Sequence, residues 1–350
     1  MIQISPRKRR RCALGAAAML CGVLAACSQP DAGSAAVPDL ALPDTSAGIP
    51  IETRQVSGLL YLPESREPQP AVLVIGGSEG GLKASGQLAK GLADAGFAAL
   101  AVAYFGHPGL PEQLIEIPLE RFDHALEWLR GDPRVRGDRI AILGASKGAE
   151  AALLVAAAHK DIAAVVVGSP SHVVWQAIDQ QSWSDRSSWS RAGSPLAWVP
   201  YDLQGPMWPL AQMYSRSLQA SQAVARAWIP VHAITAPVLL VSGDDDQLWP
   251  SFAMGESVLA ALTAAGNPNV VHHHYAAAGH AAFGIPFDPA EVDRAAIEQI
   301  GGTLEGNLAA RSDSWPKIIA FLHEALRASA AEVANTRAAN PHVRATGAQR

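Results

Sequence analysis

Five residues, Gly144-Ala145-Ser146-Lys147-Gly148, combine a serine with the glycines that a tight turn requires. Residues 139–143 before them are largely apolar, as expected for a strand buried on both faces of a parallel sheet. Residues 147–160 after them are rich in Ala and Leu and predict a buried helix. The glycines let strand and helix approach closely, and the serine between them takes a strained backbone position with an exposed hydroxyl. The pattern predicts a serine nucleophile at Ser146.

A second stretch with the same spacing, Gly76-Gly77-Ser78-Glu79-Gly80, also follows an apolar run. It continues into another glycine, a poor residue for the first turn of a helix, so Ser146 is the better nucleophile. Enzymes built on a strand, a serine turn and a helix, the α/β-hydrolases, need a loop after an earlier strand to complete their oxyanion hole. We therefore expect the backbone N–H groups of Lys147 and Ser78 to form that hole. A plain Gly-rich turn is the alternative, and the G-K-[ST] ending of a phosphate-binding loop is missing.

A serine nucleophile needs a general base, and His280 has the best position for this role. It follows the expected strand Val270–Tyr275 and a turn of small residues, which places it on a loop at the strand's carboxyl end. His124, His159 and His323 lie in expected helices and are interpreted as surface or packing residues. Three consecutive histidines alternate between the faces of one strand, so they cannot converge as a metal triad: His272, His273 and His274.

The acid that orients the histidine is expected between the serine and the histidine, just past the strand over residues 238–242. Three aspartates follow the turn glycine there. Asp246 is the preferred acid because it stands three residues after that glycine, and Asp245 is the alternative. Glu150 lies in the first turn of the helix after Ser146, where we expect it to complement the helix dipole rather than act in catalysis.

The elements that must position these side chains alternate between strand and helix along the chain. This order predicts a doubly wound, mostly parallel sheet of the α/β-hydrolase fold, with one domain over residues 51–330 and a frayed tail over residues 331–350. Strands are expected over residues 59–62, 71–75, 98–103, 139–143, 162–167, 238–242 and 270–275, and helices over residues 88–94, 120–130, 147–160, 252–264 and 315–328.

A stretch from about residue 170 to 232 breaks this alternation and carries six of the nine tryptophans. So long an insertion between core strands is often a lid or a binding loop. Clustered indoles could form an apolar wall for an acyl or aromatic group, and we expect Trp175 and Trp249 to contact the substrate. The alternative is that the rings only pack the insertion onto the core.

The N-terminus reads as an export signal. Five basic residues over positions 7–11 precede an apolar run over positions 12–26 that is too short to span a bilayer comfortably. Leu24-Ala25-Ala26-Cys27 resembles a bacterial lipobox and implies lipid attachment at Cys27; ordinary signal-peptidase cleavage is the alternative. Because Ser28 follows the cysteine, we expect an exported lipoprotein of the outer membrane that faces the periplasm. Residues 27–50 are expected to form a flexible tether.

Cysteine usage and charge narrow the function further. All three cysteines lie within the first 27 residues, which excludes disulfides, thiolate metal sites and cysteine nucleophiles from the rest of the chain. Loss of residues 1–26 removes five basic and no acidic side chains, so the formal net charge of −5 becomes −10. We expect no nucleic acid partner, no metal and no cofactor, and membrane contact only through the N-terminal lipid.

The motifs together resemble the C-terminal domain of the acyl-CoA thioesterase / bile acid-CoA:amino acid N-acyltransferase family. The resemblance covers about residues 50–328 and implies a triad of Ser146, Asp246 and His280. The amino-acid acyltransferase branch uses a cysteine where this chain has serine, which favours water as the acceptor; animal members also carry an N-terminal β-sandwich that residues 28–50 cannot contain. The matching stretches are residues 103–106, 118–122, 144–150, 243–251, 278–280 and 312–315.

These features favour a serine hydrolase that cleaves small-molecule acyl thioesters or esters through an acyl-enzyme. The resemblance implies acyl-CoA as substrate, whereas the export signal implies a compartment in which coenzyme A is not expected. A carboxylesterase or dienelactone-hydrolase-like enzyme for another ester is therefore the second hypothesis. A binding lipoprotein without catalysis is the third, and the complete set of Ser, Asp and His argues against it.

Overall fold

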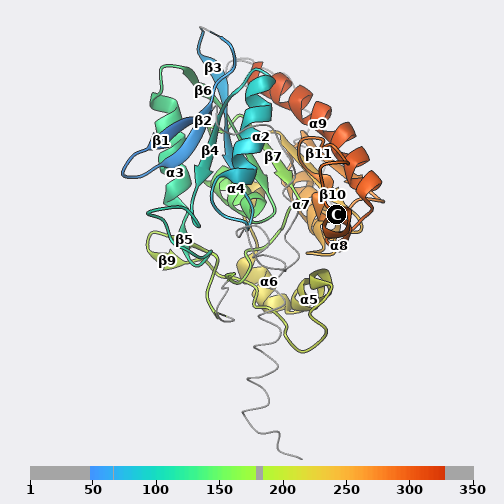
Figure 1. Ribbon diagram of the computed structural model, residues 1–350. Coiled ribbons are helices and arrows are strands. Elements are labelled where there is room, and N and C mark those ends of the chain that lie inside the picture. The colour runs from blue at the N-terminus through green and yellow to red at the C-terminus, as the bar shows by residue number, and fades with distance from the viewer. Residues whose placement is uncertain (1–47, 66, 179–183, 328–350) are drawn as a thin grey trace, which may run out of the picture.

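The computed structural model describes residues 48–65, 67–178 and 184–327 (Figure 1). They fold around an eight-stranded sheet with the strand order β1-β2-β4-β3-β6-β7-β10-β11. Neighbouring strands from β4 to β11 are parallel, and β2 is antiparallel to both of its neighbours. The prediction of a mostly parallel, doubly wound sheet is confirmed.

The strands of this sheet are β1 (Ile49–Glu52), β2 (Ser57–Tyr61), β3 (Gln69–Ile75), β4 (Ala98–Ala103), β6 (Val135–Ala145), β7 (Ala164–Gly168), β10 (Val238–Gly243) and β11 (Val270–Tyr275). A smaller sheet joins β5 (Ile117–Pro118), β8 (Trp189–Arg191) and β9 (Ser194–Pro195). The helices are α2 (Lys83–Asp94), α3 (Glu120–Gly131), α4 (Lys147–Ala158), α5 (Leu210–Ser217), α6 (Ser221–Ala227), α7 (Ser251–Ala264), α8 (Arg294–Gln299) and α9 (Leu304–Arg327).

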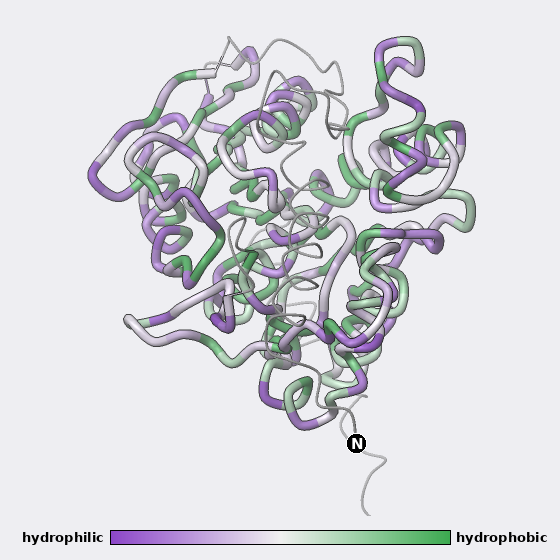
Figure 2. The backbone as a smooth tube through the Cα atoms, turned by 60° about the horizontal axis from the view of Figure 1, so that its bottom comes forward, coloured by the Kyte–Doolittle hydropathy of each residue, from purple (hydrophilic) through white to green (hydrophobic). Residues whose placement is uncertain are grey.

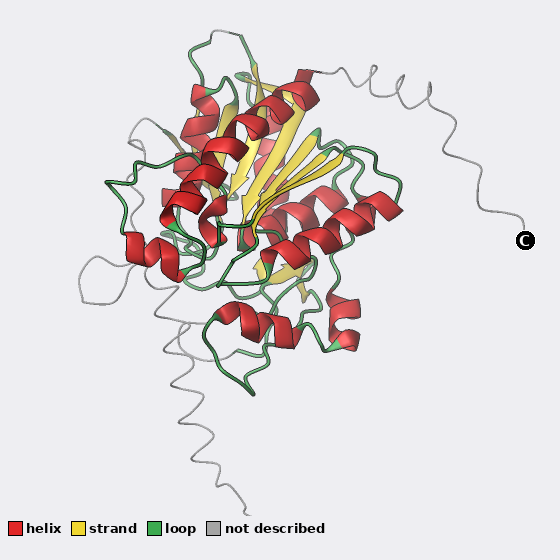
Figure 3. Cartoon of the chain, turned by 90° about the vertical axis from the view of Figure 1, so that its right-hand side faces the viewer, coloured by secondary structure: helices red, strands yellow, loops and turns green. Residues whose placement is uncertain are grey.

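The central parallel strands are apolar on both faces because helices cover both sides of the sheet, as Figure 3 shows. On β3, Val72 and Val74 pack in a cluster with α2 and α9, while Leu73 and Ile75 pack in a larger cluster with α3, α4 and α7. Hydrophilic segments lie mostly at the periphery of the chain (Figure 2). The central strands β3, β4, β6, β7 and β10 thereby bury alternate side chains in two separate cores, which fixes their register.

Some boundaries differ from the sequence expectations. Strand β1 begins at Ile49, inside the segment expected to be a tether, because it pairs with β2 at the sheet edge. Helix α9 begins at Leu304 rather than at residue 315 and continues through Pro316. Cys27, the export signal, most of the tether and the C-terminal tail lie outside the described residues.

The insertion over residues 170–232 lies at one end of the sheet, where α5 and α6 are found in Figure 1. Its strand β8 pairs with β5, which precedes α3. In the described part of the chain, no helix is both long enough and apolar enough to cross a membrane.

Candidate active site

Ser146 occupies the turn between β6 and α4 with φ 55° and ψ −119°, a left-handed conformation that is costly for a residue with a side chain. Its N–H donates to the carbonyl oxygen of Gly168 at 2.9 Å, and its own carbonyl accepts the N–H of Ala149 at 2.9 Å. The first turn of α4 and the neighbouring strand β7 therefore hold the serine in this strained position.

The two glycines of the motif are required by close backbone approach. A Cβ at Gly144 would lie 2.3 Å from the carbonyl oxygen of Gly148, and a Cβ at Gly148 would lie 2.3 Å from the carbonyl oxygens of Ile75 and Gly76. Any side chain at either position would push α4 away from the sheet. The sequence motif is thus a packing requirement that brings the loop after β3 against the serine turn.

The structure brings Ser146, His280 and Asp246 together from the carboxyl ends of β6, β11 and β10. His280 Nε2 lies 3.0 Å from Ser146 Oγ, and His280 Nδ1 lies 2.8 Å from Asp246 Oδ2. The Asp246 side chain is 1% exposed and that of His280 is 14% exposed. The imidazole therefore connects a buried carboxylate to a serine hydroxyl, the arrangement that activates a serine for nucleophilic attack.

Asp246 is held in place by backbone donors. Its Oδ1 accepts the N–H groups of Leu248 at 2.9 Å and Trp249 at 3.1 Å, which leaves Oδ2 for His280. The alternative acid, Asp245, is exposed and its Oδ2 accepts the N–H of Gly302 at 3.0 Å instead. The geometry favours Asp246 because only its carboxylate contacts the histidine.

A segment that the sequence reasoning missed, Ile300-Gly301-Gly302, braces both loops. The carbonyl oxygen of Ile300 accepts the N–H groups of His280 at 3.1 Å and Gln247 at 3.2 Å. Gly301 has φ 106°, and a Cβ there would lie 1.9 Å from the carbonyl oxygen of Asp245. The glycine pair between the last strand and the closing helix was the available signal for this close approach.

Asn307, also missed, completes this brace from the first turns of α9. Its side chain is fully buried, its Oδ1 accepts the N–H of Gly279 at 3.0 Å, and its Nδ2 donates to the carbonyl oxygen of Gly301 at 2.9 Å. The residue before His280 is thereby fixed to the glycine pair. Nothing in the local sequence distinguishes this asparagine from an ordinary surface residue of a helix.

The two expected oxyanion donors flank the serine. Lys147 is the first residue of α4, so its N–H has no acceptor within the helix. Ser78 lies in the loop after β3, and none of the described residues accepts its N–H. Gly77 brings this loop close to the nucleophile, since a Cβ there would lie 3.3 Å from Ser146 Cβ.

The side chain of Lys147 forms a buried ion pair. It is 2% exposed, its Nζ donates to Glu150 Oε2 at 2.6 Å, and it lies 5.7 Å from the ring centroid of Trp189. Glu150 Oε1 accepts the backbone N–H of Trp175 at 3.0 Å and the indole N–H of Trp189 at 2.7 Å. Burial lowers the pKa of Lys147 and raises the pKa of Glu150, and their mutual attraction opposes both shifts.

The two tryptophans expected to contact substrate have different surroundings. Trp175 is fully buried, and its indole N–H donates to Ser171 Oγ at 2.9 Å, so its contacts are those of a packing residue. Trp249 lies beside the histidine, with ring centroids 6.0 Å apart and the rings edge-on. Its indole nitrogen is buried without a partner among the described residues. Tyr214 links the two indoles, at 4.7 Å from Trp175 and 5.8 Å from Trp249.

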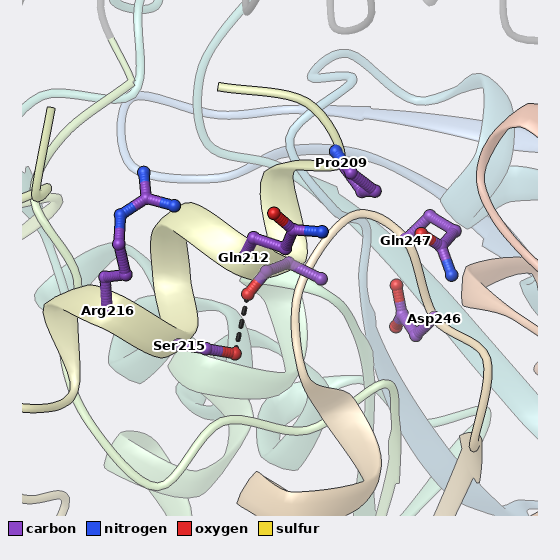
Figure 4. A pocket seen from close by; sticks show the side chains of 7 residues that line it. Pro209, Gln212, Ser215, Arg216, Asp246 and Gln247 are labelled. Carbon is purple, nitrogen blue, oxygen red and sulfur yellow. Dashed lines mark hydrogen bonds between the residues drawn. The ribbon is translucent and has the colours of Figure 1, made fainter. Parts of the chain in front are cut away.

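A pocket of about 510 Å³ opens between α5 and the loop after β10 (Figure 4). Asp246 and Gln247 line it on one side, and Gln212, Ser215 and Arg216 of α5 line it on the other. Ser215 Oγ is engaged with the carbonyl oxygen of Ala211 at 2.7 Å. The pocket reaches the candidate acid but neither Ser146 nor His280.

A second serine, histidine and carboxylate lie in line between β10, β11 and α7. Ser242 Oγ is 2.8 Å from His272 Nε2, and His272 Nδ1 is 2.7 Å from Glu256 Oε1. Ser242 is fully buried and sits inside a strand, so no substrate carbonyl reaches it. Within the described residues, no cluster of three or more His, Cys, Asp or Glu is arranged to hold a metal ion.

Solved structures share the α/β-hydrolase fold with this chain. A Klebsiella pneumoniae protein assigned as a dienelactone hydrolase has a TM-score of 0.50 at 18% identity, covering 79% of this chain and 96% of that protein. The acylaminoacyl peptidase of Pyrococcus horikoshii has a TM-score of 0.52 at 14% identity, covering 80% of this chain and 41% of the peptidase. At these identities the likeness shows the fold alone.

Relatives in sequence are acyl-coenzyme A thioesterases and an acyltransferase. Mitochondrial acyl-coenzyme A thioesterase 2 of Mus musculus is 28% identical over 284 residues, which cover 79% of this chain and 60% of the relative. Acyl-coenzyme A thioesterase 6 of Homo sapiens is 29% identical, covering 79% and 65%. Mouse bile acid-CoA:amino acid N-acyltransferase is 28% identical, covering 79% and 65%.

The chain thus spans less than two thirds of the length of these relatives. Residues 117–328, more than half of the chain, match the family described as BAAT / acyl-CoA thioester hydrolase C terminal, and this segment contains all three residues of the candidate triad. This chain belongs to that family.

Proposed function

We propose that this chain is a serine hydrolase of acyl thioesters or esters that uses Ser146, His280 and Asp246 as a catalytic triad. One observation carries the proposal: His280 lies within hydrogen-bond distance of both Ser146 Oγ and the buried carboxylate of Asp246. Membership of a thioester hydrolase family and the hydrolase fold support the same reaction class.

In the proposed mechanism, His280 Nε2 takes the hydroxyl proton as Ser146 Oγ attacks the acyl carbon. Asp246 keeps the other ring nitrogen protonated and stabilises the imidazolium. The N–H groups of Lys147 and Ser78 bind the oxyanion. When the intermediate collapses, the bond to the leaving group breaks and His280 gives its proton to the departing thiol or alcohol. Water then attacks the acyl-enzyme by the same steps and releases the carboxylic acid.

The proposed substrate class follows the relatives, whose names specify acyl-coenzyme A or succinyl-coenzyme A thioesters. Trp249 beside the base would border the acyl group in this proposal. A carboxylesterase or dienelactone-hydrolase-like activity on another ester is the second candidate, because the export signal in the sequence conflicts with coenzyme A as a physiological substrate.

The test compares hydrolysis of acyl-CoAs of increasing chain length with hydrolysis of simple aryl esters. We expect turnover of at least one class, reduced by about 10³-fold or more in Ser146→Ala. Ser242→Ala is the matched control, since this serine contacts a histidine at a similar distance but is fully buried. Equal activity of wild type and Ser146→Ala, or none of either class in the wild type, would contradict the proposal.

We also propose that the chain is exported and anchored in the outer membrane by lipid at Cys27. The lipobox-like residues 24–27 and Ser28 support this location. Metabolic labelling with a palmitate analogue, followed by membrane fractionation, should show label in wild type and none in Cys27→Ala. Unlabelled protein in the cytoplasmic fraction would refute it.

A further inference from the structure

Glu79 is a partly buried carboxyl group in the loop after β3, and the proposed triad does not use it. Its Oε1 accepts the N–H of Gly77 at 2.8 Å. Burial raises the pKa of Glu79, and the N–H groups of Glu79 and Gly77 and the charge of His280 oppose that shift. A desolvated acid in a loop of glycines needs an explanation beyond turn formation.

This carboxyl group lies alongside the candidate nucleophile. A Cβ at Gly77 would be 2.7 Å from Glu79 Oε2 and 3.3 Å from Ser146 Cβ. A Cβ at Gly76 would likewise be 2.8 Å from Glu79 Oε1. The two glycines therefore leave the space that the carboxyl group fills, and Gly77 lies close to both the carboxyl group and the serine.

Tyr104, which follows β4, holds the same loop through the loop's carbonyl groups. Its hydroxyl lies 2.8 Å from the carbonyl oxygens of both Gly76 and Gly77, and the residue is 1% exposed. The carbonyls are thus fixed by Tyr104 and the Gly77 N–H by Glu79. The N–H of Ser78, between them, has no acceptor within the described residues and is free to bind an oxyanion.

The charged and titratable groups that face Glu79 come from two other elements. His280 interacts with Glu79 from the loop after β11, and Tyr104 interacts with it from the segment after β4. Glu150 of α4 also acts on Tyr104. His280 is the group among them that becomes a cation during the proposed reaction. A negative charge at Glu79 therefore attracts the positive charge that forms on His280 during the reaction.

We propose that Glu79 is a positioning residue: its carboxylate holds the loop of residues 76–80 so that the Ser78 N–H faces the oxyanion, and its charge stabilises protonated His280. This inference rests on the proposed serine hydrolase mechanism and adds a fourth residue to it. Glu79 touches neither reacting atom and acts through the loop and the histidine.

Two variants separate the roles. Glu79→Gln keeps an oxygen that can accept the Gly77 N–H and loses the charge; we expect kcat within about 10-fold of wild type. Glu79→Ala loses both, and we expect kcat to fall about 10²-fold with little change in KM, as for loss of an oxyanion donor. Glu256→Gln is the matched control, because that glutamate bonds His272 of β11 in the separate Ser242 arrangement and has no contact with the proposed triad.

The pH profile supplies a readout that a purely structural role would not change. If the carboxylate is required, kcat/KM falls as pH drops through the raised pKa of Glu79, and this titration is absent in Glu79→Gln. The acidic limb of Glu79→Gln should therefore fall less steeply than that of wild type. Should Glu79→Ala not fold, this comparison still decides the matter.

Wild type and Ser146→Ala are measured in the same series so that two failures can be told apart. Serine-dependent turnover with unchanged kcat and pH profile in both Glu79 variants would overturn this inference alone. A higher kcat in Glu79→Ala would also overturn it, since the carboxylate would then obstruct the hole. Absence of serine-dependent turnover in wild type would overturn the proposed function itself.

Discussion

The two carboxylate oxygens of Asp246 have different partners, one structural and one in the proposed triad. Backbone N–H groups occupy Oδ1 and His280 occupies Oδ2. Asp246→Asn keeps the shape but presents the wrong hydrogen-bonding group to Nδ1, so we expect kcat to fall by about 10³–10⁴-fold. Asp245→Asn is the control and should stay within about 10-fold. Comparable losses in both variants would contradict the assignment of Asp246.

At the scale of residues, the sequence could predict those candidate site residues whose positions follow from the order of the strands. Ser146, Asp246 and His280 each come directly after a parallel strand, and the carboxyl ends of such strands meet at one edge of the sheet. Asn307 and Glu79 could not be found this way. Their roles depend on the path of a loop or on contacts between segments distant in the chain, such as that of Asn307 with Gly279.

At the scale of elements, α4 is tied to the insertion by its buried ion pair. Glu150 accepts hydrogen bonds from Lys147 Nζ and from N–H groups of Trp175 and Trp189, which lie 25 and 39 residues away in the chain. Glu150→Ala would leave a buried ammonium unpaired, so we expect the free energy of unfolding to fall by about 3–5 kcal/mol. Urea denaturation measures this free energy.

The control is Asp94→Ala, which breaks an exposed pair with Lys90 and should lower the free energy of unfolding by about 0.5 kcal/mol or less. Equal effects would refute the buried role.

The sequence predicted only that Glu150 complements the dipole of its own helix. The structure adds its contacts with Trp175 and Trp189, which are distant in the chain. Helix α9 shows the same limit: the sequence predicted a helix over residues 315–328, but the preceding turns are fixed by Asn307 and Arg311, which bond loops around His280. Strand β4 and strand β11, whose apolar or alternating runs are bounded by turns, were predicted with their observed limits.

At the scale of the whole molecule, stability should depend on pH through His172 at the start of the insertion. Its burial lowers its pKa from 6.5 to about 4, and its Nδ1 has no partner among the described residues. Between these values the unfolded chain binds a proton that the folded chain does not, so stability is lost as pH falls from about 6.5 to 4. The loss is on the order of 3 kcal/mol.

His172→Gln removes this titration and should flatten the dependence of the unfolding free energy on pH in that window. The exposed His232, near the end of the insertion, supplies the control variant His232→Gln. Denaturation curves at pH 7, 6, 5 and 4 provide the comparison. A slope that is the same in wild type and His172→Gln would show that His172 is not the linked group.

The measurement that tests the central claim most directly is the site of acylation. The reaction with an activated aryl ester is quenched with acid in its first turnover, and the protein is digested and mapped by mass spectrometry. We predict the acyl mass on the peptide that contains Ser146, in wild type and in Ser242→Ala, and its absence in Ser146→Ala. An acyl group on any other residue, or turnover that persists without an adduct on Ser146, would contradict the account.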